Sequence, residues 1–206
     1  MANVLRQAAS AAGVGADRPA APPPSLPGDA GFWTFIAADA TLFALLFFQF
    51  SLDRSSHVAV FDAGQRAALV PLGAVNTLVL VTSSFLLASG IRSAHRREVR
   101  RATWLIAGTV LLGVVFAFLK ITEYWIELAS GHTLSTSSFF MYYFVITGIH
   151  LLHLIVGVSA LVIIGVRVRR GSGARQDRLL LECGASYWHL IDLLWMFIFP
   201  LLYLAR

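Results

Sequence analysis

Five long apolar segments, separated by short polar connections, occupy most of the chain after residue 28. They are expected at about Gly31–Phe50, Leu69–Ile91, Thr103–Ile126, Phe139–Val166 and Cys183–Ala205. Each reaches about 20 residues, the length that an α-helix needs to cross a hydrocarbon core roughly 30 Å thick. Strands of a membrane β-barrel would be about half as long and would alternate apolar with polar residues. The pattern therefore predicts an all-α, polytopic membrane protein, a bundle of five transmembrane helices within residues 29–206.

The first 28 residues have a different composition. They are rich in Ala and Pro and contain no apolar run long enough for the core of a signal peptide. We expect residues 1–28 to form a disordered tail. The whole chain is 57% hydrophobic and 13% charged, which fits the membrane class. Its single cysteine, Cys183, excludes an internal disulfide.

The basic residues lie mostly in two of the connections between the segments. The first connection contains Arg54 and Arg66, and the third contains neither Arg nor Lys. The second and fourth are rich in arginine, and their arginines are Arg92, Arg96, Arg97, Arg100, Arg101, Arg167, Arg169, Arg170, Arg175 and Arg178. The positive-inside rule then places the N-terminus and these two connections in the cytoplasm and the C-terminus outside. Because the positive charge follows topology, we expect no nucleic-acid partner.

Several ionisable side chains fall inside the apolar segments, where a charge costs about 2.5–3.5 kcal/mol on insertion scales. Lys120, Glu123 and Glu127 share one helical stripe, and Lys120 is placed to pair with Glu123. The simplest way to accommodate the remaining groups is a buried polar network between helices. Its expected members are Asp39, Glu123, His150, His153, Glu182, His189 and Asp192.

Histidines at matched depth on facing helices also suggest a metal or haem site. His150 and His153 are three residues apart, and His189 is expected at a similar depth. A membrane di-iron site would need more histidines than the six present. We therefore favour histidines that hydrogen-bond Asp192, Asp39 or backbone carbonyls, with no catalytic residue and no metal or cofactor ligand on this chain. A free-standing membrane haem protein or a transporter remains the alternative from another class.

Three blocks of sequence are similar to the cytochrome c oxidase subunit III family. Residues 31–39 read Gly-Phe-Trp-Thr-Phe-Ile-Ala-Ala-Asp, like the family's aromatic-rich helix with a buried acid. Residues 147–153 match its Thr-Gly-x-His-x-x-His pattern. Glu182 followed by Tyr-Trp-His-Leu-Ile-Asp-Leu-Leu-Trp at residues 187–195 matches a third block. The chain resembles the short, five-helix form of the family.

The resemblance implies a subunit III of a respiratory haem-copper terminal oxidase in a bacterial plasma membrane, supporting aerobic electron transport and proton uptake. It implies no haem or copper on this chain, both being expected in partner subunits such as the catalytic subunit I. It also implies bound phospholipid, in a cleft between the first two helices and the remaining three. Lys120 stands where oxidase members often have Gln, and residues 27–29 resemble the type associated with nitric oxide reductase. An accessory subunit of a nitric oxide reductase is therefore the second candidate.

Overall fold

The computed structural model describes residues 30–170 and 175–205, and within these ranges the chain is helical with no strand. Its elements are α2 (Ala30–Ser56), α3 (Val58–Ala67), α4 (Val70–His95), α5 (Val99–Ala129), α6 (Ser138–Arg170), α7 (Arg175–Phe199) and the π-helix η1 (Pro200–Leu204). Five helical spans are long and apolar enough to cross a membrane. The last of them, Gln176–Leu204, consists of α7 and η1 taken together. The predicted all-α fold with five such helices is confirmed. The tail predicted at residues 1–28 lies outside the described residues.

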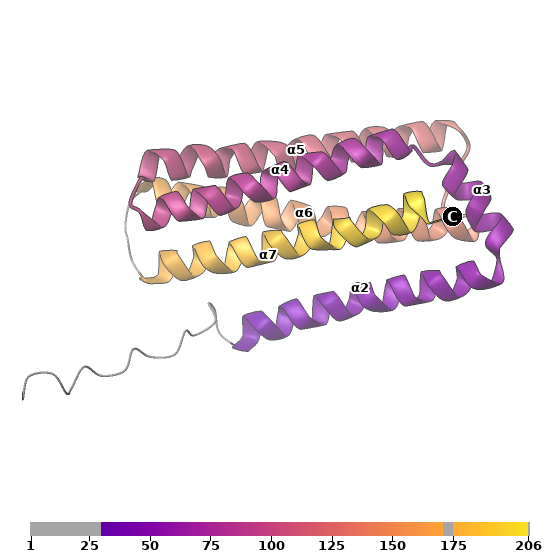
Figure 1. Cartoon of the computed structure of the whole chain (residues 1–206), viewed down its shortest axis with the longest axis horizontal. Coiled ribbons are helices and arrows are strands. Elements are labelled where there is room, and N and C mark those ends of the chain that lie inside the picture. Colours follow the sequence, from indigo (N-terminus) through magenta and orange to yellow (C-terminus); the bar gives the residue numbers. More distant parts are fainter. Residues whose placement is uncertain (1–29, 171–174, 206) are drawn as a thin grey trace, which may run out of the picture.

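The five spanning helices form a bundle of four and one helix that lies apart. Helices α4, α5, α6 and α7 pack side by side, whereas α2 runs along one side of this bundle (Figure 1). Contacts of α2 are with α3, α6 and α7. The second spanning helix, α4, packs extensively against α5 and also against α7. The expected division into two helices and three is therefore wrong, because the face of α4 that carries Asn76, Leu80 and Ser83 is buried in the bundle and only α2 is separate.

A short helix that the sequence pattern did not predict connects α2 to the bundle. Residues 58–67 had been assigned to a connection, but they form α3, which lies across one end of the bundle (Figure 1). Phe61, Gly64 and Gln65 are its buried residues, and the Gln65 side-chain amide donates to the carbonyl of Leu201 at 3.0 Å. This helix is too short to span a membrane, so it lacks the long apolar run by which the five spanning helices were predicted.

Most helices extend beyond the apolar segments that predicted them. For example, α5 begins at Val99 rather than Thr103, and α7 begins at Arg175 rather than Cys183. Hydropathy marks where the hydrocarbon ends, whereas backbone hydrogen bonding continues through the arginine-rich ends. The predicted segments are therefore the most apolar parts of longer helices.

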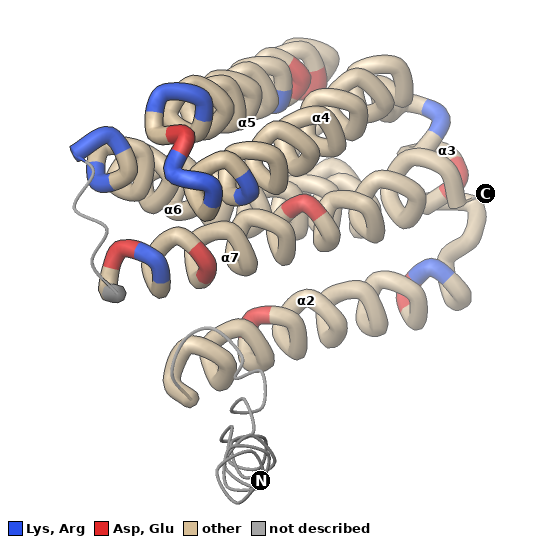
Figure 2. The backbone as a smooth tube through the Cα atoms, turned by 60° about the vertical axis from the view of Figure 1, so that its left-hand side comes forward, with Lys and Arg blue, Asp and Glu red and all other residues tan. Residues whose placement is uncertain are grey.

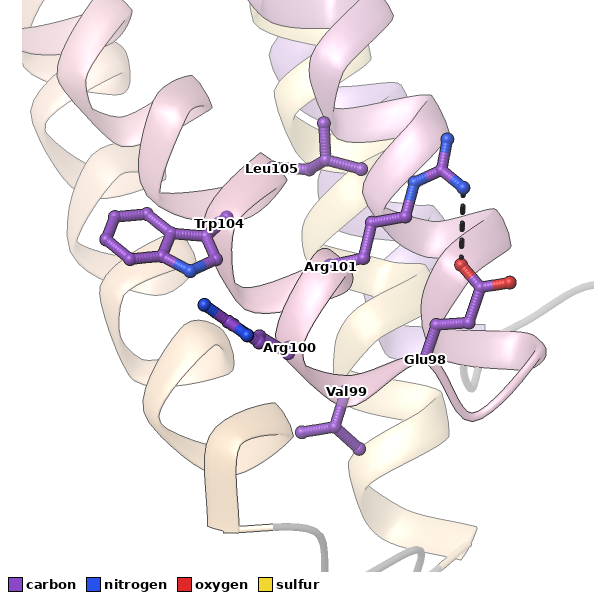
Figure 3. Close-up of a pocket in the computed structure, with 6 residues that line it drawn as sticks. All are labelled: Glu98, Val99, Arg100, Arg101, Trp104 and Leu105. Atoms are coloured by element: carbon purple, nitrogen blue, oxygen red, sulfur yellow. Dashed lines mark hydrogen bonds and ion pairs between the residues drawn. The ribbon is translucent and has the colours of Figure 1, made fainter.

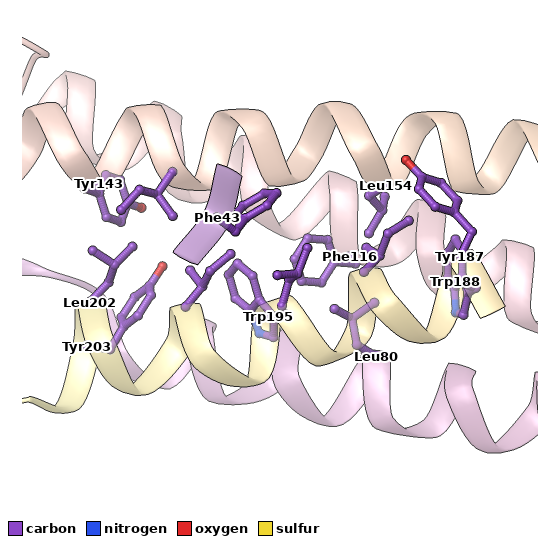
Figure 4. Close-up of a cluster of buried hydrophobic side chains, with 14 of the residues drawn as sticks. Phe43, Leu80, Phe116, Tyr143, Leu154, Tyr187, Trp188, Trp195, Leu202 and Tyr203 are labelled. Carbon is purple, nitrogen blue, oxygen red and sulfur yellow. The ribbon is translucent and has the colours of Figure 1, made fainter. Parts of the chain in front are cut away.

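Two tryptophans on α7 occupy the centre of the bundle (Figure 4). The indole of Trp188 donates to Ser83 Oγ at 3.2 Å, and that of Trp195 donates to Thr77 Oγ1 at 3.0 Å. Both partners belong to α4, so each ring packs by its apolar surface while its N–H is satisfied. These bonds fix the depth of α7 against α4.

The last helical turn widens at a proline. Pro200 has no backbone N–H, and η1 begins at this residue as a π-helix. Leu202 and Tyr203 of the widened turn are fully buried. The π-helix thereby brings the Tyr203 hydroxyl into the bundle, where it faces α5 and α6.

Candidate functional site: buried polar groups in the membrane bundle

A fully buried ion pair lies within the bundle and is surrounded by tyrosines. Lys120 Nζ on α5 is 3.1 Å from Glu123 Oε2, one turn later on the same helix. The same ammonium donates to the hydroxyls of Tyr143 on α6 at 3.0 Å and Tyr203 on η1 at 2.7 Å. We call these four residues the Lys120 cluster.

The hydrogen bonds of the Lys120 cluster form a closed set. Tyr143 and Tyr203 both donate to Glu123 Oε1, at 2.7 and 2.6 Å. All three ammonium protons therefore have an acceptor, and both carboxylate oxygens have a donor. The Lys120 side chain is only 1% exposed, so these bonds compensate charges that water does not reach. This arrangement joins α5, α6 and the C-terminal turn.

A second polar contact joins α2 to the bundle. Asp39 Oδ1 lies 2.9 Å from His153 Nε2 on α6. The other ring nitrogen, Nδ1, lies 2.7 Å from the carbonyl oxygen of Ile149. Phe43, one turn after Asp39, packs edge-on against the imidazole with ring centroids 5.6 Å apart.

The carbonyl contact identifies which ring nitrogen of His153 carries a proton. A carbonyl oxygen only accepts, so Nδ1 of His153 is the donor to Ile149. Its Nε2 faces the carboxylate of Asp39. The pair is therefore the polar contact at the seam between α2 and α6.

His150 differs from His153, although the two share a helix face. It is fully buried, and neither ring nitrogen has a hydrogen-bond partner among the described residues. Its ring packs against Phe116 and Trp195, with centroids 5.6 and 5.2 Å away. The structure thus places His150 in an aromatic cage, without the carboxylate or carbonyl that the sequence led us to expect.

His189 and Asp192 face α4 rather than α6. The Nδ1 atom of His189 is 2.7 Å from the hydroxyl oxygen of Ser84. All three side chains line a groove of about 410 Å³ between α4 and α7. Asp192 is buried, and neither carboxylate oxygen has a hydrogen-bond partner within 3.5 Å in the described part of the chain.

Glu182 lies at the arginine-rich end of the molecule. Its carboxylate is 3.9 Å from His95 Nε2, and both side chains are partly exposed. The charges of the second and fourth connections gather at this same end (Figure 2). The seven predicted residues therefore form no single network, because Glu123, the Asp39–His153 pair, His150, the groove and Glu182 occupy separate places.

A shallow pocket of about 620 Å³ lies at this end, beside the start of α5 (Figure 3). Arg100 and the exposed Trp104 line it, together with Val99 and Leu105. Arg101 lines it too and contacts Glu98 at 3.5 Å. The combination of guanidinium groups, an indole and aliphatic surface is typical of a membrane–water interface.

The sequence reasoning missed the two tyrosines that bond the buried ion pair. Tyr143 and Tyr203 complete the Lys120 cluster. Near the other end of α5, the carboxylate of Glu127 binds the His132 ring at 2.7 Å. A search for tyrosines at the depth of each buried charge could have found the first two. Within residues 30–170 and 175–205, no three His, Cys, Asp or Glu side chains are grouped as metal ligands would be.

Several known proteins are similar to this chain over most of its length. The subunit 3 of the cytochrome bo(3) ubiquinol oxidase of Pseudomonas aeruginosa is 28% identical over 174 residues, 84% of this chain and 83% of that protein. The cytochrome c oxidase subunit 3 of Thermostichus vulcanus is 33% identical over 181 residues, covering 84% and 85%. The quinol oxidase subunit 3 of Bacillus subtilis is 30% identical over 177 residues, covering 84% and 85%. The family model of cytochrome c oxidase subunit III matches residues 28–205, which include every described residue, and this chain therefore belongs to the cytochrome c oxidase subunit III family.

Proposed function

We propose that this chain is the non-catalytic subunit III of a respiratory haem-copper terminal oxidase, whose haem and copper are held by partner subunits. The match of the family model across residues 28–205 carries the proposal. The buried groups support it, because Lys120 and Glu123 pair with each other and His153 pairs with Asp39. Such pairs stabilise helix contacts in lipid and leave these side chains no open position for a substrate.

The relatives support an oxidase rather than a nitric oxide reductase as the complex. The three described above are named as subunits of cytochrome c or quinol oxidases. Lys120 stands where the resemblance led us to expect Gln in an oxidase member. Its ammonium is fully bonded by Glu123, Tyr143 and Tyr203, so packing within this chain accounts for it.

A role in proton uptake rests on the Asp39–His153 pair. Asp39 and His153 are 2.9 Å apart, and the His153 side chain is 16% exposed, so the pair is close to the outer face of the seam between α2 and α6. Intramembrane acids and histidines commonly take part in proton relays. In this role the pair passes protons to the catalytic subunit, and the other helices of the bundle keep their positions.

The membrane orientation and lipid contacts follow from the arginine-rich end. This end faces the cytoplasm of a bacterial plasma membrane, which puts the N-terminus inside and the C-terminus outside. The pocket beside Arg100 and Trp104 takes a phospholipid, with its phosphate on the guanidinium and its acyl chains on Leu105. This interfacial pocket replaces the expected cleft as the lipid site.

Affinity purification from native membranes tests the assignment. An affinity-tagged chain should bring down a haem-containing oxidase in equal stoichiometry, shown by a reduced-minus-oxidised spectrum and by the subunit masses. The tagged chain expressed alone should show no Soret band. Extract from cells with the untagged chain is the control. Stoichiometric haem on the isolated chain, or purification with no haem-containing partner, would overturn the proposal.

A further inference from the structure

The groove between α4 and α7 opens on the lipid-facing surface and combines an apolar rim with a polar floor. Its rim is formed by exposed apolar side chains, and its floor by small or polar ones. The lining residues are Leu80, Val81, Ser84, Phe85, Ala88, His189, Asp192, Leu193 and Met196. Helix α7 runs between α4 and α2 (Figure 2), and α2 makes its contacts with α3, α6 and α7.

The carboxylate of Asp192 lacks the hydrogen bonds that its burial requires. The residue is 7% exposed, and neither oxygen has a partner within 3.5 Å among the described residues. Ser84 is the neighbouring hydroxyl, and it is already 2.7 Å from His189 Nδ1. Even with its hydroxyl turned toward Asp192, it would supply a single donor to a group that accepts several. An unsatisfied polar group within the hydrocarbon costs several kcal/mol, so the missing donor is expected from outside the chain.

Depth restricts what that donor is. Ser84 lies near the middle of α4, and Asp192 lies near the middle of the span that joins α7 to η1. Lipid headgroups lie roughly 15 Å from the midplane of the hydrocarbon core. At the depth of Asp192 a lipid offers only acyl chain, which has no hydrogen to donate. A polar side chain on another transmembrane helix meets both requirements.

The shape of the α4 surface also suits a helix. Ser84 and Ala88 are one turn apart and form a small-xxx-small pair, which allows two helix backbones to approach closely. Val81 and Phe85 stand beside this strip on α4, and Leu193 and Met196 stand opposite on α7. These four exposed side chains provide the apolar contact that such a helix would bury.

We propose that the α4–α7 groove is the docking site for a transmembrane helix of another subunit of the oxidase complex, which donates a hydrogen bond from mid-membrane depth to Asp192. This inference rests on the proposed function, because it needs a complex with further membrane subunits. It identifies the surface of this chain that contacts those subunits. It also gives Asp192 and Ser84 a role between subunits rather than within the bundle.

The first test exchanges Asp192 for leucine in the tagged complex. If the carboxylate serves a partner helix, D192L should weaken retention of the chain by the haem-containing subunits roughly 3- to 30-fold, the range of one interhelical hydrogen bond in a membrane. The thermal stability of D192L expressed alone should equal or exceed that of the wild type, because leucine replaces a buried carboxylate that has no hydrogen-bond partner within 3.5 Å among the described residues. Lower stability of the isolated variant with unchanged retention would show a role within the chain and overturn the proposal.

A second test leaves Asp192 intact and fills the groove. Val81 in the groove and Val162 on α6 are 49% and 47% exposed, so V81W and V162W change matched surfaces. V81W should release the chain from the complex, whereas V162W should leave it bound. Equal retention of both variants, with the wild type still bound to the oxidase, would overturn the docking site and leave the proposed function standing.

Photocrosslinking then identifies the occupant. A photoreactive amino acid at Leu193 in the groove should form an adduct with another subunit of the complex. The same amino acid at Leu152 on α6, which is also exposed, should react with lipid. Lipid adducts alone at Leu193 would show that acyl chains fill the groove and would overturn the proposal.

Discussion

The Lys120 cluster and the contact between α2 and the bundle solve the same problem in different ways. In the cluster, Lys120 and Glu123 are enclosed by two tyrosines, and each proton and carboxylate oxygen is satisfied. In the α2 contact, Asp39 has one bond to His153 and a second oxygen, Oδ2, without a partner among the described residues. The charged groups that join the helices of the bundle are fully hydrogen-bonded, whereas the carboxylate that attaches α2 keeps one oxygen without a partner among the described residues.

The side chains around the Lys120 cluster are also more deeply buried than those around the contact of α2. Helices α4 to α7 meet through buried aromatic rings such as Trp188 and Trp195. Most of α2 is exposed, and its buried residues are Asp39, Phe43 and Phe50. The aromatic ring of Phe50 packs on Phe61 of α3 and on Tyr142 of α6. We therefore expect α2 to separate from the bundle before the bundle itself opens.

The largest effect is expected from removing one partner of the Lys120 cluster. K120M leaves the Glu123 carboxylate buried without its cation, which typically costs about 3–5 kcal/mol. The melting temperature of the detergent-solubilised chain should fall markedly.

The double variant K120M/E123Q is the matched control. It removes both charges and leaves an amide oxygen to accept from Tyr143 and Tyr203, so it should recover much of the lost stability. An unchanged melting temperature in K120M would contradict the view that the ion pair holds the bundle together.

The next effect concerns close packing between α6 and α7. A Cβ atom at Gly157 would lie 2.8 Å from Ile191 Cδ1 and 3.0 Å from Trp188, so G157A should cost about 1–3 kcal/mol through overpacking. On the same helix, the nearest atom to a Cβ at Gly148 is the Tyr124 hydroxyl oxygen at 3.9 Å. Thermal unfolding of G148A should match or exceed the wild type, and equal losses in both variants would argue against tight packing at Gly157.

A smaller and local effect is expected at α2. D39L removes the bond to His153, worth about 0.5–2 kcal/mol in a membrane, and should loosen α2 while the bundle stays folded. Spin labels at Phe48 and Leu152, both exposed, with Cys183 replaced by serine, should show a broader distance distribution by pulsed electron resonance.

T41V is the control for α2, since the Thr41 hydroxyl donates to the Ala37 carbonyl of the same helix at 2.7 Å. Its distance distribution should equal that of the wild type. A D39L distribution as narrow as that of T41V would mean that aromatic contacts alone hold α2 in place.

The smallest effect is expected at the surface. Arg101 and Glu98 are 3.5 Å apart and well exposed, and such pairs contribute about 0–1 kcal/mol. R101A should therefore shift the melting temperature within error, in low and high salt alike. A loss comparable to that of K120M would show that the arginine-rich end contributes to the stability of the bundle.

Much of the fold could be predicted because the hydrocarbon core imposes a single length on every span. Five runs of about 20 apolar residues required five helices, and the spacing of Lys120 and Glu123 placed both on one stripe. Helix α3 was not predicted, since a short helix at the end of a bundle has no span-length signature. The π-helix at Pro200 also escaped, because proline indicates a break but not the hydrogen-bonding pattern that follows it.

The sequence by itself determined that buried charges need partners, but the tertiary structure decided which partners they have. Asp39 pairs with His153, whereas Asp192 and His189 turn to α4, because helix rotation and depth are set by side-chain packing along the whole interface. His150 and His153 occupy one stripe, yet one lies among aromatic rings and the other at a carboxylate. Periodicity defines a face of a helix, and only the packed bundle defines what that face meets.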